Sequence, residues 1–157
     1  MLPPDDLAAR LAELAGPPWD GILYRAVFLE DLFGFHRPTR HPRPLPLYSL
    51  GAPSHGARYT PQGAMATLYM AEDHETAFAE AHQLGASIKR HAPAAAEPRR
   101  PTVLVSAQTH LDSVLDIADA AVQASLGTDV KELLRPWRRA QRRGVVATQQ
   151  LGLAVFE

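Results

Sequence analysis

An apolar segment, residues 21–28, carries a single charge near its centre, Arg25. Its length and composition predict a β-strand, in which alternate side chains face opposite sides. Leu23 and Val27 share the face of Arg25, and the other face is also apolar, so both faces are expected to be buried. A guanidinium stays charged and is seldom buried without a partner. The strand therefore predicts a structural ion pair, an arginine that reaches solvent near a strand end, or contact with the anionic group of a ligand.

The composition is typical of one soluble globular domain and excludes several classes of protein. Of 157 residues, 46% are hydrophobic and 21% are charged, and the net charge of -1 gives no overall attraction to nucleic acid or to a membrane. The absence of cysteine excludes disulfides, thiolate metal sites and cysteine nucleophiles. Residues 1–6 do not resemble a signal peptide, and no apolar run approaches the roughly 20 residues that span a bilayer. We expect a cytoplasmic protein of bacterial type.

Strands and helices are mixed in this sequence without a regular βαβ alternation. This mixture predicts an α+β (mixed α/β) fold in a single domain, residues 1–157, with residues 1–18 as an N-terminal helix and lead-in. The predicted strands are residues 21–28, 66–71 and 102–106, with 110–117 as a further strand or an extended approach to a helix. The predicted helices are a stretch that begins at Asp5 and ends before Gly16, residues 74–84, two stretches around Gly127 with Thr128 as an N-cap, an arginine-rich helix between Pro136 and Gly144, and residues 148–155. The predicted loops are residues 29–62, which are irregular and typical of a functional loop, and residues 86–101.

The predicted helix after Asp73 carries an acidic residue beside its apolar face. Asp73 is a good N-cap, and Gly85 is expected to end the helix. Ala77 and Ala81 lie in the apolar stripe, and Glu80 lies at the edge of that stripe. A carboxylate in this position is well placed to line a cleft, although a helix glutamate is more often simply exposed to solvent.

Residues 56–63 combine two glycines and a proline around Arg58 and Tyr59. This composition predicts a fixed turn that presents side chains. The fork of donors on an arginine suits a phosphate group, so the turn is either an anion-binding element or an ordinary surface turn.

Taken in order, these segments resemble the RES domain family. The similarity covers roughly residues 20–157, and the order and spacing of its motifs carry it rather than any one of them. The matching segments are Tyr24-Arg25-Ala26, residues 56–63, Thr67-Leu68-Tyr69-Met70-Ala71, Thr76-Ala77-Phe78-Ala79-Glu80-Ala81 and Thr148-Gln149-Gln150-Leu151-Gly152.

The resemblance implies a fold similar to that of ADP-ribosyltransferases of the diphtheria-toxin type. It also implies that the protein is the toxin of a toxin–antitoxin pair with an Xre-like DNA-binding antitoxin. The toxin would then contact nucleic acid only indirectly, through the antitoxin. Such proteins consume NAD, by degrading it or by transferring ADP-ribose to an acceptor. On this resemblance Arg25 and Arg58 hold the dinucleotide, Tyr69 packs near the nicotinamide and its ribose, and Glu80 is the central catalytic carboxylate, with Arg25 beside it in the catalytic set. Whether the protein forms a homo-oligomer is left open.

One part of the family pattern has no counterpart in this sequence. The signature serine of the family follows the 148–152 segment in a further strand, whereas Ser106 and Ser113 lie too early to be matched to it. The C-terminal family segment is therefore expected to be absent. A RES-like protein that binds without catalysis is one alternative that this departure leaves open.

Single features of the sequence bear on two other functions. The arginines around Trp137 could bind nucleic acid, although the near-zero net charge favours a solvated basic helix. They are Arg135, Arg138, Arg139, Arg142 and Arg143, of which all but Arg143 would cluster on one helix face. The seven histidines have no spacing typical of metal ligands, so no metal is expected.

Overall fold

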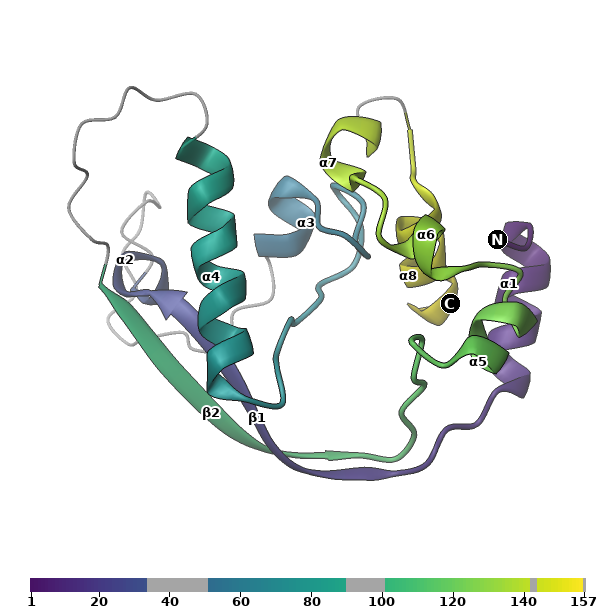
Figure 1. Ribbon diagram of the computed structural model, residues 1–157, viewed down its shortest axis with the longest axis horizontal. Coiled ribbons are helices and arrows are strands. Elements are labelled where there is room, and N and C mark those ends of the chain that lie inside the picture. Colours follow the sequence, from purple (N-terminus) through teal and green to yellow (C-terminus); the bar gives the residue numbers. More distant parts are fainter. Residues whose placement is uncertain (34–50, 90–100, 142–143, 157) are drawn as a thin grey trace. The chain divides into compact units, whose positions relative to one another are not determined.

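The computed structural model describes residues 1–33, 51–89, 101–141 and 144–156 (Figure 1). Helices together with a small sheet confirm the predicted α+β class. The strands are β1 (Trp19–Phe28) and β2 (Thr102–Leu111). The helices are α1 (Pro4–Glu13), α2 (Leu29–Leu32), α3 (Gly51–His55), α4 (His74–Lys89), α5 (Ala120–Ser125), α6 (Val130–Leu133), α7 (Trp137–Ala140) and α8 (Ala147–Phe156).

The chain divides into two compact units, although the sequence predicted a single domain. The first unit consists of Met1–Trp19, Ser49–Thr67 and Leu111–Glu157. The second consists of Asp20–Tyr48 and Leu68–His110. The assignment of residues 1–157 to one functional domain stays a prediction. Within the described ranges, no helix combines the length and the apolar character that crossing a bilayer requires.

The second unit is built on the pairing of β1 with β2 (Figure 1). The side chain of Gln108 donates to Asp20 at 2.9 Å, and the backbone N–H of Leu29 donates to the carbonyl of Pro101 at 2.9 Å. Because the partner residue number falls as the β1 number rises, the two strands are antiparallel.

The expectation that both faces of β1 are buried is wrong. Every residue of β1 is half-buried or exposed, and Ile22 is 47% exposed. In the described part of the chain the sheet has two strands, so each strand has an open edge, and a pair of strands buries its side chains only where other elements pack on its faces. Arg25 is therefore a half-buried cation rather than a fully buried one.

The predicted strand over residues 66–71 is also wrong. Only Ala71 pairs, through an isolated bridge in which Tyr24 N–H donates to Ala71 at 2.7 Å and Ala71 N–H donates to Tyr24 at 2.8 Å. An apolar run becomes a strand only where a neighbouring backbone supplies hydrogen bonds along its length, and here one residue receives them.

Helix α4 begins where the sequence predicts and ends later. The carboxylate of Asp73 accepts from the backbone N–H of Thr76 at 2.7 Å and from its hydroxyl at 2.8 Å, which confirms the N-cap. The helix then continues through Gly85 to Lys89, so Gly85 does not end it. A glycine inside a helix costs only about 1 kcal/mol, which the residues on either side can offset. Of the loops predicted from composition, residues 34–50 and 90–100 lie outside the described residues.

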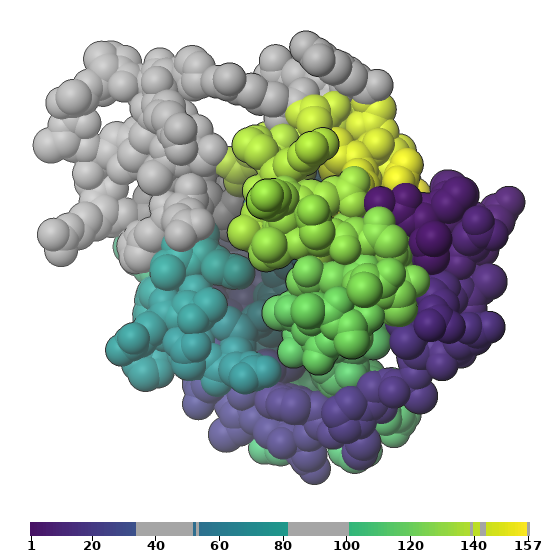
Figure 2. All heavy atoms as spheres, turned by 45° about the vertical axis from the view of Figure 1, so that its right-hand side comes forward, coloured from purple at the N-terminus to yellow at the C-terminus, as the bar shows by residue number. Residues whose placement is uncertain are grey.

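The first unit has its core where α1 packs against α8, which lie side by side in the space-filling view (Figure 2). Leu7, which is 0% exposed, joins Leu126, Leu133 and Leu151 in one buried cluster. Leu7 lies on the apolar stripe that predicted α1, so this part of the prediction is confirmed. Helix α8 likewise confirms the helix predicted over residues 148–155.

Two details of the predicted helices in this unit are wrong. Asp129, rather than Thr128, caps α6, because its carboxylate accepts from the backbone N–H of Glu132 at 2.7 Å. The arginine-rich helix shrinks to the four residues of α7, which includes Arg138 but not Arg135. Arg135 and Arg138 therefore do not share one helix, and Arg142 and Arg143 lie outside the described residues.

Glu132 ties the N-terminus to the first unit. Its carboxylate accepts from the α-amino group of Met1 at 3.0 Å and from the hydroxyl of Thr128 at 2.8 Å. The Thr128 hydrogen bond and, after it, the charge and hydrogen bond of the α-amino group lower the pKa of Glu132.

This lowered pKa predicts a specific loss of stability in acid. A carboxylate whose pKa is lower in the folded state stabilises the fold above its unfolded pKa of about 4.3, and this contribution is lost as the pH falls through the folded pKa. At pH 7 the melting temperature of Glu132→Gln should therefore be lower than that of the wild type. The difference between the two melting temperatures should narrow as the pH falls below about 4. Melting curves from pH 7 to pH 3 measure it, with the exposed Glu13→Gln as the control. A gap that does not depend on pH would contradict the assignment.

Candidate functional site

Arg25 is a half-buried cation on β1, in the second unit. Burial lowers the pKa of its guanidinium, and the nearby charge of Asp31 on α2 acts in the opposite direction and raises that pKa. An arginine pKa lies far above neutrality, so the group keeps its charge. The charge of the Asp31 carboxylate therefore acts on Arg25, which is compatible with the structural ion pair that the sequence left open.

The strand around Arg25 is tied to the start of α4. The neighbouring residue, Tyr24, forms the backbone bridge with Ala71 that was described above. The ring of Tyr24 also meets the ring of His74 edge-on, with 6.3 Å between their centroids. Tyr69 lies two residues before the bridge and is half-buried. The first turn of α4 and the residues that lead into it are therefore held at β1.

Glu80 lies on α4 beside a buried face, as the sequence predicts. Ala77 and Ala81 are each 5% exposed, and Glu80 is exposed to solvent. Small residues on the buried side allow close packing, while the carboxylate stays accessible at the edge. This arrangement fits a carboxylate that meets a ligand from solvent, and it also fits an ordinary surface glutamate.

The turn over residues 56–63 is fixed, as predicted. The backbones of Ala57 and Thr60 exchange hydrogen bonds of 2.8 and 3.3 Å. Gly56 and Gly63 have φ angles of 74° and 82°, a region that favours glycine. Thr60 is 0% exposed, and its hydroxyl donates to the hydroxyl of Thr67 at 2.7 Å.

Arg58 projects from this turn toward the end of α6. Its guanidinium donates to the carbonyl of Leu133 at 2.7 Å and, less closely, to that of Arg135 at 3.5 Å. The last carbonyls of a helix have no partner within the helix and carry partial negative charge, so an arginine there is favourable. In this structure Arg58 braces the turn against α6.

Gln149 on α8 is a functional candidate that the sequence reasoning missed. Its side chain is 1% exposed, and its amide nitrogen donates to the carbonyl of Ala57 at 3.0 Å and to the side chain of Gln141 at 3.2 Å. A longer contact of 3.4 Å reaches the carbonyl of Thr60. A glutamine side chain is normally expected at the surface. Only its place in the 148–152 segment could have identified Gln149 as a candidate.

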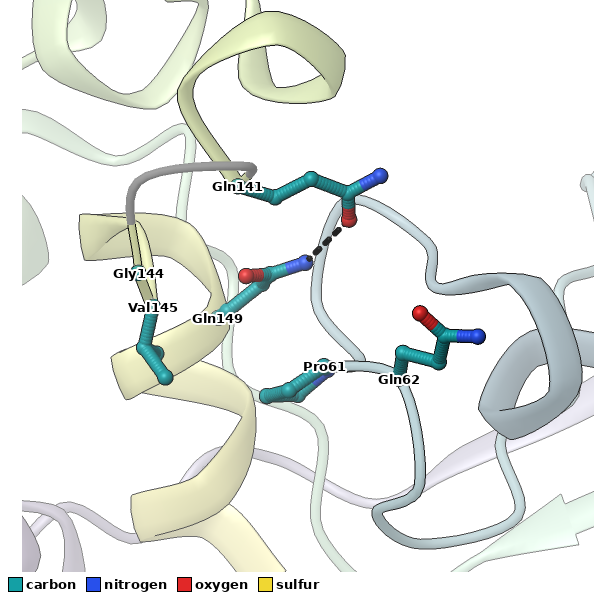
Figure 3. A pocket seen from close by; sticks show the side chains of 6 residues that line it. All are labelled: Pro61, Gln62, Gln141, Gly144, Val145 and Gln149. Carbon is teal, nitrogen blue, oxygen red and sulfur yellow. Dashed lines mark hydrogen bonds between the residues drawn. The ribbon is translucent and has the colours of Figure 1, made fainter.

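An open pocket of about 430 Å³ adjoins Gln149 in the first unit (Figure 3). The side chain of Gln149 points between Gln141 and the Pro61–Gln62 end of the turn. The pocket is lined by Pro61, Gln62, Gln141, Gly144, Val145 and Gln149. The pocket therefore lies where the turn over residues 56–63 meets α8.

The predicted site residues are divided between the two units. Arg25, Tyr69 and Glu80 belong to the second unit, and Arg58 belongs to the first. Among the residues that the structure describes, no group of three or more histidine, aspartate or glutamate side chains is placed to hold a metal ion.

The chain belongs to the RES domain family, because the model of the RES domain matches residues 22–157. This confirms the resemblance seen in the sequence. The fold is similar to that of a chain in the crystal structure of the M. tuberculosis MbcT–MbcA toxin–antitoxin complex, with a TM-score of 0.68 and 17% sequence identity. That similarity covers 97% of this chain and 71% of the other. No curated protein sequence matches the chain.

Proposed function

We propose that the protein cleaves the bond between nicotinamide and ribose in NAD and acts as the toxin of a toxin–antitoxin pair. The observation that carries the proposal is the match of the RES domain over residues 22–157, a range that includes Arg25, Arg58, Tyr69 and Glu80. The similarity in fold to a chain of a toxin–antitoxin complex supports it. The antitoxin would be an Xre-like DNA-binding protein, and the pair would act in the cytoplasm, where NAD is found.

The reaction proposed for Glu80 is the breakage of a glycosidic bond. The bond from the anomeric carbon of the ribose to the nicotinamide nitrogen breaks, and its electron pair leaves with nicotinamide, which becomes a neutral molecule. Positive charge then builds on the ribose, as in other oxocarbenium-like transition states. A carboxylate near the ribose hydroxyls stabilises this charge and orients the sugar.

The acceptor completes the reaction. An oxygen of water, of phosphate or of a protein side chain forms the new bond to the anomeric carbon, and a proton of the acceptor passes to solvent. With water the products are ADP-ribose and nicotinamide. Because nicotinamide leaves as a neutral base, no strong general acid is needed on the leaving group.

The proposed role of Arg25 is to hold the diphosphate of NAD. Its guanidinium is half-buried on β1, so less water competes with an anion there than at a fully exposed arginine. A guanidinium also matches the oxygens of a phosphate with two donors at once. Arg58 would contribute to the same recognition, and Tyr69 would pack near the nicotinamide and its ribose.

Substitution of Arg25 separates this role from a structural one. If Arg25 holds the diphosphate, Arg25→Ala should raise the KM for NAD about 10- to 100-fold, the usual worth of a charged hydrogen bond, and Arg25→Lys should recover part of it. Steady-state nicotinamide release measures the effect. Arg10→Ala, which removes an exposed arginine paired with Glu13, is the matched control. If Arg25 serves only as an ion pair with Asp31, both Arg25→Ala and Asp31→Asn will lower the melting temperature and leave KM unchanged.

A nucleic-acid-binding function has less support. It rested on an arginine-rich helix, and α7 spans only Trp137–Ala140. Arg138 lies over the ring of Trp137, with 5.4 Å to the ring centroid, so part of its surface is occupied by a local contact.

A further inference from the structure

We infer that Gln149 is a positioning residue, whose buried side chain fixes the turn over residues 56–63 and thereby sets where Arg58 meets the anionic part of NAD. The inference rests on the proposed function and adds to it a residue that does not itself touch NAD. It concerns the first unit alone.

The hydrogen bonds of Gln149 bracket Arg58 along the chain. The amide nitrogen donates to the carbonyl of Ala57, immediately before Arg58, at 3.0 Å, and contacts the carbonyl of Thr60, two residues after it, at 3.4 Å. The same two residues exchange the backbone hydrogen bonds that close the turn. A single side chain from α8 thus reaches both ends of the short loop that carries Arg58.

The burial of Gln149 strengthens the effect of its hydrogen bonds on the conformation of the turn. Gln149 is 1% exposed, so an amide donor of its side chain that lost its acceptor would have no bulk water to replace it. The contact to Gln141, at 3.2 Å, fixes the amide from a third side (Figure 3). A rearranged turn would leave the buried amide of Gln149 without its acceptors in the turn, which favours a single backbone conformation of residues 57–60.

The side chain that the turn positions is the guanidinium of Arg58. It donates to the carbonyl of Leu133 at 2.7 Å through one terminal nitrogen, Nη1, and a guanidinium carries five N–H donors in all. The turn backbone and the Leu133 contact together determine the direction of Arg58. A purely structural glutamine would stabilise the fold, whereas a positioning glutamine should also affect NAD binding through Arg58.

A double-mutant cycle in the full chain distinguishes these roles, because coupled residues do not have additive effects. Gln149→Leu keeps the approximate size of the side chain and removes its donor. It should raise the KM for NAD about tenfold with a smaller change in kcat. In an Arg58→Ala background the same substitution should change KM by no more than about twofold. If Gln149→Leu changes KM by the same factor in the wild type and in Arg58→Ala, the inference is overturned. An unchanged KM in Gln149→Leu alone would overturn it as well.

Leu7→Ala serves as the control for general loss of stability. Leu7 is buried in the core of the first unit and makes no hydrogen bond to the turn through its side chain. It should lower the melting temperature without raising KM when assayed well below that temperature. A tenfold rise in KM for Leu7→Ala as well would show that KM reports stability alone, and would also overturn the inference.

The outcome for the wild type separates failure of this inference from failure of the proposed function. If the wild type neither binds NAD nor releases nicotinamide, the proposed function fails, and the role of Gln149 in placing Arg58 on NAD fails with it. Its effect on the turn is still decided by amide hydrogen exchange of Ala57 and Thr60. Faster exchange in Gln149→Leu would support a fixed turn, and unchanged exchange would contradict it.

Discussion

Gly152→Ala is expected to destabilise the protein by about 3 kcal/mol, although alanine is the better helix former. Gly152 lies within α8, and a Cβ built there would overlap the carbonyl oxygen of Tyr59 and lie 2.8 Å from its carbonyl carbon. The obstacle is backbone, which cannot rotate aside as a side chain does. Either α8 or the turn over residues 56–63 must move, and both are packed in the first unit.

Gly63→Ala is the matched control for this prediction. A Cβ at Gly63 would meet nothing within 4 Å, but its φ of 82° is unfavourable for alanine and should cost about 1 kcal/mol. Thermal melting of the two variants compares a steric overlap with backbone strain. On helix propensity alone Gly152→Ala would be stabilised by about 1 kcal/mol. A melting temperature equal to or above that of the wild type would therefore contradict the packing of α8 on the turn.

Glu80→Gln is expected to lower the rate of nicotinamide release on the order of 100-fold while leaving the melting temperature close to that of the wild type. Loss of one group that stabilises transition-state charge typically costs this much. Glutamine has the same size and shape but cannot stabilise positive charge on the ribose. Because Glu80 is exposed, the fold should tolerate the change.

The control for Glu80→Gln lies on the same helix. Glu75 is exposed in the first turn of α4, and Glu75→Gln removes an equal charge. It should leave the rate of nicotinamide release within about twofold of the wild type, since an exposed charge five residues away is well screened. A similar loss of rate in both variants would mean that the overall charge of α4 matters, and that Glu80 has no special role.

The elements that the sequence predicted correctly are those with a local signal. Leu7 marks the apolar stripe of α1, Asp73 has the side chain of an N-cap, and the glycines at 56 and 63 have φ angles that favour glycine. Each of these signals acts over a few neighbouring residues, so no knowledge of the tertiary fold is needed to interpret it.

The predictions that failed depend on partners distant in the sequence. The segment 66–71 has the composition of a strand but receives a backbone partner only at Ala71. The burial of β1 depends on which distant elements pair with it and pack on its faces, which an apolar pattern cannot reveal. Gln149 was missed for the same reason, because its burial is explained only by carbonyls about 90 residues earlier in the chain.

The candidate site was found by the order of its motifs rather than by the chemistry of any one residue. Glu80 alone is an exposed helix glutamate, and Arg58 alone is a turn arginine whose guanidinium contacts the end of α6. The match of the RES domain confirms the family, while the roles of Arg25, Arg58, Tyr69 and Glu80 stay predictions.

The most direct test of the central claim is the quantity of nicotinamide released when purified wild-type protein is incubated with NAD. The proposed function predicts that nicotinamide accumulates in step with the loss of NAD, at one molecule per molecule consumed, and that Glu80→Gln nearly abolishes this release. If wild-type protein with a cooperative melting curve releases no nicotinamide and consumes no NAD, the proposed function is wrong.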